Sequence, residues 1–138
     1  MKAAMIQRNG GPEVFVYGDV PDPTVDPGGV VVDIHAASVN AADWKVRSDE
    51  YGGADLSFPY VLGRDFSGVV RTVGEGVKDF TVGDAVFGVC DVGQEGAYAE
   101  QISIKASIIA HKPDKLSHVT ASALALTGLT ATVSLEDT

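Results

Sequence analysis

A single cysteine, Cys90, among 138 residues excludes an internal disulfide framework. Basic residues are also scarce, because 10 lysines and arginines stand against 19 aspartates and glutamates, a formal net charge of -9. Such an acidic surface repels a phosphate backbone, so the composition disfavours nucleic acid as a partner. The acidic balance otherwise indicates solubility and does not point to a particular substrate.

Long apolar runs are lacking as well. From the sequence we expect no segment close to the ~20 apolar residues of a membrane-spanning helix, and hence no membrane partner. Residues 1–7 lack the apolar core and the cleavage site of a signal peptide, so we expect a cytoplasmic protein. No basic neighbour in the sequence would activate the thiol of Cys90, which is therefore expected to be a small buried apolar residue.

Short alternating apolar runs separated by glycine-rich turns fill most of the chain, which has room for one domain. The clearest strand is 29–37, in which Val30, Val32 and Ile34 share one face. Further strands are predicted over 2–7, 13–17, 65–73, 84–89 and 97–104, the first two forming a pair. This spacing predicts a mainly β fold, a small barrel or a sandwich.

Two segments break the β pattern. Residues 40–47 are typical of a short helix, with Asn40 as its N-cap and Asp43 in its first turn. Residues 119–135 are apolar or small nearly all round, which is typical of a helix buried on several sides. Gly128 in the middle of that segment predicts a break in the helix or a close approach to its backbone.

Consecutive motifs run in a fixed order along nearly the whole chain. They occupy residues 10–14, 39–48, 51–52, 58–70, 73–77, 82–88, 96–100 and 128–131. Each is weak alone, but in this order and spacing they resemble the medium-chain dehydrogenase/reductase superfamily, in its zinc-independent quinone oxidoreductase-like branch. The resemblance implies that residues 1–118 form a GroES-like catalytic domain, a partly open β-barrel with a few short helices. Residues 119–138 would begin linker helices toward a Rossmann domain, whose glycine-rich fingerprint is absent here.

The same resemblance bears on metal binding. Zinc-dependent members place a cysteine ligand where this chain has Asn40, and a histidine of a Gly-His-Glu motif where it has Arg64. Arginine cannot lose its proton to bind a metal, and an asparagine amide is a poor ligand for Zn²⁺. We therefore predict no metal site. Arg64 and Asp65 are expected to pair with each other, or with Asp43, as a structural ion pair in the place of the metal.

The resemblance implies an NAD(P)H-dependent reductase of quinones, enones or related carbonyl compounds, which binds NADP(H) or NAD(H) mostly through the Rossmann domain. Hydride transfer leaves negative charge on the substrate oxygen, which then needs a hydrogen-bond or proton donor. By resemblance Asn40 lies near the nicotinamide and the substrate as a catalytic and cofactor-binding residue, and Asp43 helps to hold the cofactor site. The two residues can also be a plain helix-capping pair, an interpretation that weighs equally for Asp43, whereas the site is favoured for Asn40; the two roles are compatible.

Three further residues complete the predicted site. Lys45 stands near a position where related reductases often carry a tyrosine, and its ammonium could polarise the substrate instead. Tyr51 matches a tyrosine of the substrate pocket, or is an exposed aromatic in a glycine-rich turn. Thr130 matches a position that hydrogen-bonds the nicotinamide end of the cofactor, or bonds back to its own helix. Gly128 favours the cofactor role, because it would let a ligand approach the backbone closely.

Two functions from different classes remain open on the sequence alone. In the first, the chain is the N-terminal domain of such a reductase, homo-oligomeric at full length and inactive alone because half of the dinucleotide surface is missing. In the second, it is a stand-alone GroES-like binding module whose apolar segment 119–135 covers a partner. We favour the first, because the chain stops abruptly after that segment. Asn40 and Arg64 disfavour a degenerate zinc alcohol dehydrogenase, whereas the substrate and the choice between NADH and NADPH stay open.

Overall fold

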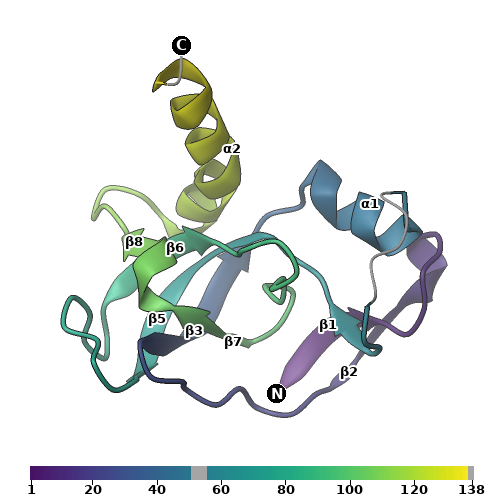
Figure 1. The fold of residues 1–138 in the computed structure, drawn as a ribbon, viewed down its shortest axis with the longest axis horizontal. Helices are drawn as coiled ribbons and strands as arrows, with labels where there is room; N and C mark the ends of the chain where they lie inside the picture. The colour runs from purple at the N-terminus through teal and green to yellow at the C-terminus, as the bar shows by residue number, and fades with distance from the viewer. Residues whose placement is uncertain (51–55, 137–138) are drawn as a thin grey trace.

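Two β-sheets dominate the computed structural model, which describes residues 1–50 and 56–136 (Figure 1). The larger sheet has the strand order β7-β3-β5-β6-β8, and the smaller has the order β2-β1-β4. The strands are β1 (Lys2–Ile6), β2 (Phe15–Asp19), β3 (Gly29–Ala37), β4 (Tyr60–Val61), β5 (Asp65–Val73), β6 (Ala85–Val89), β7 (Gln101–Lys105) and β8 (Ile109–His111). The helices are α1 (Ala41–Ser48) and α2 (His118–Glu136), and Pro12–Val14 and Ala106–Ile108 form single 3₁₀ turns. The mainly β prediction is confirmed, and the sheets stay open instead of closing into a barrel.

The main hydrophobic core lies on the five-stranded sheet, where β3 and β5 form an antiparallel pair. Its buried members are Val30, Val32, Phe66, Val70, Phe80, Val86, Cys90, Ala97, Ile102 and Ile104. Gly68 sits in the middle of β5, opposite Ile34. A Cβ atom there would lie 2.1 Å from the carbonyl oxygen of Asp33, so the close approach of the two strands requires glycine.

The long predicted strands agree closely with the structure. Strands 29–37 and 65–73 are found with the predicted bounds, and 2–7 and 84–89 differ by one residue at one end. The strand predicted over 97–104 begins later, at Gln101, because the segment before it bonds to the smaller sheet: the N–H of Ala4 donates to the Tyr98 carbonyl at 2.8 Å. Strands β4 and β8 were not predicted, since two or three residues are too short to show alternation.

Helix α2 stands on the five-stranded sheet and rises away from it (Figure 1). Its first residue, His118, contacts Ser67 of β5 through Nδ1 and Oγ at 2.8 Å. Ala121 and Ala125 are buried against the sheet, whereas Leu129 and Val133 are about half exposed and Leu135 more so. The prediction of burial on several sides is therefore wrong for this chain, because an all-round apolar composition does not tell which faces have a neighbour.

One expectation about membranes also needs correction. By length and composition alone, α2 is long and apolar enough to cross a bilayer, contrary to the expectation that no segment comes close. Core helices of soluble proteins meet the same criterion, and the buried alanines show that the first half of α2 packs on its own sheet. The finding therefore concerns the helix composition and assigns no location.

The helix continues through Gly128 without a break, so the predicted interruption is wrong. A Cβ atom at Gly128 would meet nothing within 4 Å. We expect Gly128→Ala to raise the free energy of unfolding by about 0.5–1 kcal/mol in urea denaturation, because alanine restricts the unfolded chain and suits the helix. Gly83→Ala is the matched control: it also meets open space, but its φ of +97° disfavours alanine, so stability should fall. A loss of stability in both variants would contradict this account of α2.

Candidate functional site

Helix α1 begins where the sequence predicts, with Asn40 as its N-cap. The backbone N–H of Asn40 donates to Oδ2 of Asp43 at 2.7 Å, and the N–H of Asp43 donates to the carbonyl oxygen of Asn40 at 3.0 Å. The carboxyl group of Asp43 thus closes the first turn, where the helix dipole favours negative charge. The capping role of this pair is confirmed, and it holds Asn40 at a defined place between β3 and α1.

Asp43 is almost fully buried, at 3% exposure, and accepts a second hydrogen bond from the Tyr98 hydroxyl at 2.9 Å. Its Oδ1 has no hydrogen-bond partner among the described residues. Burial is the main cause that raises the pKa of Asp43, although the hydrogen bonds from Asn40 and Tyr98 lower it. Burial, and then the bond to Asp43, raises the pKa of Tyr98, so this hydroxyl keeps its proton and acts as a donor.

Asp43 gives the stability a pH dependence of defined sign. A carboxyl group whose folded-state pKa lies above its unfolded value of about 3.9 binds its proton more tightly in the folded protein. Its contribution to stability is complete below pH ~3.9 and is lost as the pH rises through the folded-state pKa. We expect Asp43→Asn to remove this fall in the free energy of unfolding, as measured by urea denaturation from pH 3 upward. Asp114→Asn, on an exposed loop, should leave it in place, and an unchanged slope in Asp43→Asn would refute the assignment.

A second buried carboxyl group, Asp65 at the start of β5, ties the loop before α1 to the sheet. The backbone N–H and the hydroxyl of Ser38 donate to Asp65 Oδ1 at 3.1 and 2.7 Å. Asn40 Nδ2 donates to Asp65 Oδ2 at 3.1 Å and lies 3.3 Å from Ser38 Oγ. Both N–H bonds of the Asn40 amide are thus directed into this network. Toward a ligand, the Asn40 side chain can therefore act only as an acceptor, through its carbonyl oxygen.

Asn40 and Thr130, far apart in the sequence, line one pocket of about 440 Å³. Its lining residues are Asn40, Ala41, Ala42, Leu126, Thr127, Thr130 and Ala131, from the beginning of α1 and the middle of α2. The Thr130 hydroxyl donates to the Leu126 carbonyl oxygen at 2.8 Å, as expected of an ordinary helical threonine. That bond leaves its lone pairs to accept, so Asn40 and Thr130 both offer acceptors to a ligand that carries N–H or O–H groups.

The remaining predicted site residues do not join this pocket in the described part of the chain. Lys45 lies in the last turn of α1, is half-buried, and has its Nζ 5.6 Å from the centre of the Trp44 ring. Lys45 is not among the residues that line the pocket of Asn40 and Thr130. Tyr51 falls outside the described residues. The catalytic roles of Lys45 and Tyr51 stay predictions.

The ion pair expected in the place of the metal is absent. Among the described residues, Arg64 forms no ion pair with Asp65 or Asp43, and its Nε is shielded from solvent without a hydrogen-bond partner. Arg64 directly precedes β5, and successive side chains along an extended chain point to opposite sides, so Arg64 and Asp65 diverge. No group of three or more histidine, cysteine, aspartate or glutamate side chains able to hold a metal occurs among residues 1–50 and 56–136.

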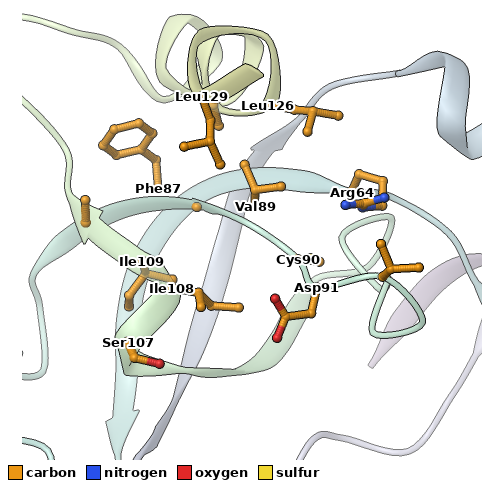
Figure 2. A pocket seen from close by; sticks show the side chains of 14 residues that line it. Arg64, Phe87, Val89, Cys90, Asp91, Ser107, Ile108, Ile109, Leu126 and Leu129 are labelled. Carbon is orange, nitrogen blue, oxygen red and sulfur yellow. The ribbon is translucent and has the colours of Figure 1, made fainter. Parts of the chain in front are cut away.

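A larger pocket, of about 570 Å³, lies between the edge of the five-stranded sheet and α2 (Figure 2). Its walls are mostly apolar, with Phe87, Val89, Ile108, Ile109, Leu126 and Leu129 among the side chains in view. Arg64 and Asp91 bring charge to the same pocket. Leu126 lines this pocket and also that of Asn40 and Thr130, so the two are neighbours. Sequence reasoning missed the larger pocket, because several segments distant in the sequence form it.

Cys90 closes one side of this pocket and behaves as the sequence predicts. It is 1% exposed and belongs to the main core. Burial is the main cause that raises the pKa of its thiol, to about 12, against the lowering effect of Arg64. The thiol therefore stays protonated at neutral pH and is a poor nucleophile. Its role as a small buried apolar residue is confirmed.

The open β-sheets, the capped helix α1 and the pocket between α1 and α2 define a GroES-like domain of the type found in alcohol dehydrogenases. The family described as the alcohol dehydrogenase GroES-like domain matches residues 26–114, and the chain belongs to this family. The resemblance to its quinone oxidoreductase-like branch is confirmed by the relatives that follow.

Two curated relatives and one solved structure are similar to the chain. It is 37% identical over 119 residues to the human mitochondrial NAD(P)H oxidoreductase RTN4IP1, covering 76% of this chain and 30% of that protein. It is 38% identical over 136 residues to the trans-enoyl reductase fsr4 of Gibberella fujikuroi, covering 98% of this chain and 38% of the relative. The structure of Escherichia coli quinone oxidoreductase complexed with NADPH matches with a TM-score of 0.86 and 31% identity, covering 94% of this chain and 39% of that one. The chain thus spans 30–39% of the length of these proteins.

Proposed function

We propose that the chain is the substrate-side domain of an NAD(P)H-dependent oxidoreductase that reduces quinones, enones or related carbonyl compounds without zinc. The observation that carries this proposal is the pocket that Asn40 and Thr130 share, because the family resemblance implies that both lie at the nicotinamide end of a cofactor. The relatives support it, since their names include an NAD(P)H oxidoreductase, a trans-enoyl reductase and a quinone oxidoreductase complexed with NADPH.

The residues of this pocket fit the carboxamide end of a nicotinamide. Asn40 and Thr130 offer acceptors, which a carboxamide NH₂ group can satisfy, and the side chains around them are mostly small and apolar. When bound, the nicotinamide supplies a hydride to an electrophilic carbon of the substrate. Asn40 is held for its task by Asp65, Ser38 and the α1 cap, so its carbonyl oxygen is oriented before a ligand arrives.

The absence of zinc from the proposal follows from the chemistry of the side chains. Asn40 and Arg64 occupy the positions of two ligands in zinc-dependent members of the resembled superfamily. The Asn40 amide nitrogen is engaged by Asp65, and a guanidinium keeps its protons, so neither side chain suits Zn²⁺. The substrate oxygen must then be stabilised by hydrogen-bond donors of the protein instead of a Lewis acid.

Two measurements on the native gene product test the proposed function. The first is its intact mass, which we expect near 35 kDa, the mass of a protein with about two domains. The second is oxidation of NADPH and NADH in the presence of 1,4-naphthoquinone or an enone. If the gene product has the mass expected of two domains but oxidises neither NADPH nor NADH with either acceptor, the proposal is overturned. A product near 14 kDa would favour the binding module instead, with the exposed half of α2 as its contact surface.

A pair of matched variants tests the cofactor pocket within that assay. Thr130→Val removes the acceptor in the pocket, and we expect it to raise the KM for NADPH about tenfold. Thr132→Val is the control, because the Thr132 hydroxyl makes the same kind of bond, to the Gly128 carbonyl at 2.9 Å, but is not among the residues that line the pocket. Equal KM values for the two variants would remove Thr130 from the cofactor site.

A further inference from the structure

The hydrogen-bond network around Asn40 does not supply a donor for the substrate oxygen in the proposed reaction. A quinone or enone that accepts a hydride gathers negative charge on its oxygen, which needs a donor. The Asn40 amide donates to Asp65 and towards Ser38, and the Tyr98 hydroxyl donates to Asp43. These two donors are already engaged inside the protein, so neither is the group that meets the substrate oxygen.

Arg64 is a donor without an assigned task. Among the described residues its guanidinium has no ion pair, and its Nε has no hydrogen-bond partner. Leaving a shielded donor unpaired is unfavourable, and such a group calls for a specific explanation. Arg64 lines the apolar pocket of about 570 Å³ shown in Figure 2, and also a pocket of about 350 Å³ that Ala42 and Val46 of α1 help to form.

We propose that Arg64 is a catalytic residue whose guanidinium donates a hydrogen bond to the carbonyl oxygen of a quinone or enone seated in the larger pocket. This inference rests on the proposed function. The electron pair of the hydride ends in the new C–H bond of the substrate, and the negative charge that reaches the oxygen is stabilised by Arg64. Arginine keeps its own protons, so a proton from water completes the O–H bond, or the α C–H bond of a reduced enone. The oxidised nicotinamide remains as the second product.

The surroundings of Arg64 favour a neutral carbonyl compound over a permanently anionic substrate. Glu95 lines the smaller pocket together with Arg64, and Asp91 lines the larger one. These acidic groups and the formal charge of -9 would repel a carboxylate before it reached the guanidinium. The apolar walls formed by Phe87 and Leu129 suit a flat hydrocarbon ring whose only polar atoms are carbonyl oxygens.

The proximity of the two pockets is consistent with this assignment. Leu126 lines the pocket with Arg64 and also the pocket with Asn40 and Thr130. A substrate in the first and a nicotinamide in the second would therefore be neighbours on either side of one side chain. Transfer of a hydride further requires that the two reacting carbons meet at about 3–3.5 Å past the edge of Leu126.

The test compares two flat ligands on the native gene product without nicotinamide, 2,3-dimethyl-1,4-naphthoquinone and 2,3-dimethylnaphthalene, which share a carbon skeleton and differ in the two carbonyl oxygens. The methyl groups block addition of a thiol to the quinone ring, so binding is read without a reaction at Cys90. We expect the wild-type chain to prefer the quinone in a calorimetric or NMR titration. Arg64→Met should reduce the affinity for the quinone about tenfold and leave that for the hydrocarbon unchanged. Arg71→Met is the control, because Arg71 is an exposed residue of β5 that pairs with Asp33.

Two results would overturn the assignment of Arg64. One is an unchanged preference for the quinone in Arg64→Met. The other is an equal loss of affinity for both ligands, which would mean that Arg64 only shapes the pocket. A measurement on the wild-type chain covers the case in which Arg64→Met does not fold: the Arg64 Nε–H resonance should shift on addition of the quinone and stay in place with the hydrocarbon. The opposite pattern would also refute the proposal. None of these results depends on NADPH oxidation, so failure of the proposed function is detected separately.

Discussion

Replacing Asp65 with alanine is expected to lower the free energy of unfolding by about 3 kcal/mol, measured by urea denaturation at neutral pH. The side chain is fully buried and accepts hydrogen bonds from the Ser38 N–H, the Ser38 hydroxyl and the Asn40 amide. Alanine would leave these three donors without their acceptor, and each buried donor left unpaired costs about 1–3 kcal/mol. Because Asp65 holds the loop before α1 to the sheet, the variant should also lose the fixed orientation of Asn40.

Asp33→Ala provides the matched control for that prediction. Asp33 also lies in the five-stranded sheet, but it is on its surface, where it pairs with Arg71 at 3.3 Å. Exposed ion pairs contribute little, so we expect a change of less than about 1 kcal/mol. Similar losses of unfolding free energy in the two variants would show that the buried hydrogen bonds of Asp65 contribute no more to stability than an exposed ion pair.

Local patterns made the framework predictable. Strands β3 and β5 could be predicted because each is a long run of β-formers that ends at turn residues, and both are found with the predicted bounds. The cap of α1 was predictable for a related reason, since an N-cap bond joins Asn40 to a residue only three positions later. These features depend only on residues that are close together in the sequence, so the local sequence pattern is enough to predict them.

Features that depend on distant neighbours could not be predicted. The burial of α2 depends on what covers its faces, and an apolar composition is the same for a covered helix and an open one. Arg64 and Asp65 are adjacent in sequence and opposite in charge, yet Asp65 turns to Ser38 and Asn40 while Arg64 lies at the pocket. The choice between these arrangements is made by strand direction and by the loop before α1.

The candidate site combines features that the sequence predicts with features that only the fold determines. Asn40 and Thr130 were named from a resemblance, and only the fold brings them to one pocket. The direction of the Asn40 amide is beyond any sequence pattern, because it follows from which atoms of Asp65 and Ser38 surround it. That direction matters for the chemistry, since it makes Asn40 an acceptor, and a substrate oxygen then needs another donor, the role proposed for Arg64.

The orientation of the amide leads to the second large effect, which is expected for Asn40→Asp. The substitution places a second carboxyl group where Asn40 Nδ2 now lies 3.1 Å from Asp65 Oδ2. Two carboxylates at this distance cannot both ionise readily, so one should hold its proton well above the ordinary pKa. We expect the variant to be less stable than the wild type by about 2–3 kcal/mol at pH 8, because one carboxyl group must then lose its proton beside another, and to recover most of the loss near pH 4.

The sign of this pH dependence separates repulsion from simple loss of the amide. A carboxyl group with a raised folded-state pKa contributes stability below its unfolded value of about 3.9, and that contribution disappears as the pH rises through the folded value. Asn40→Ala also removes the amide bonds to Asp65 and Ser38 but adds no charge, so its deficit relative to the wild type should change much less between pH 4 and pH 8. If Asn40→Asp showed the same weak pH dependence as Asn40→Ala, the side chain at position 40 would not face Asp65. The acceptor role of Asn40, and with it the need for Arg64 as the donor, would then be lost.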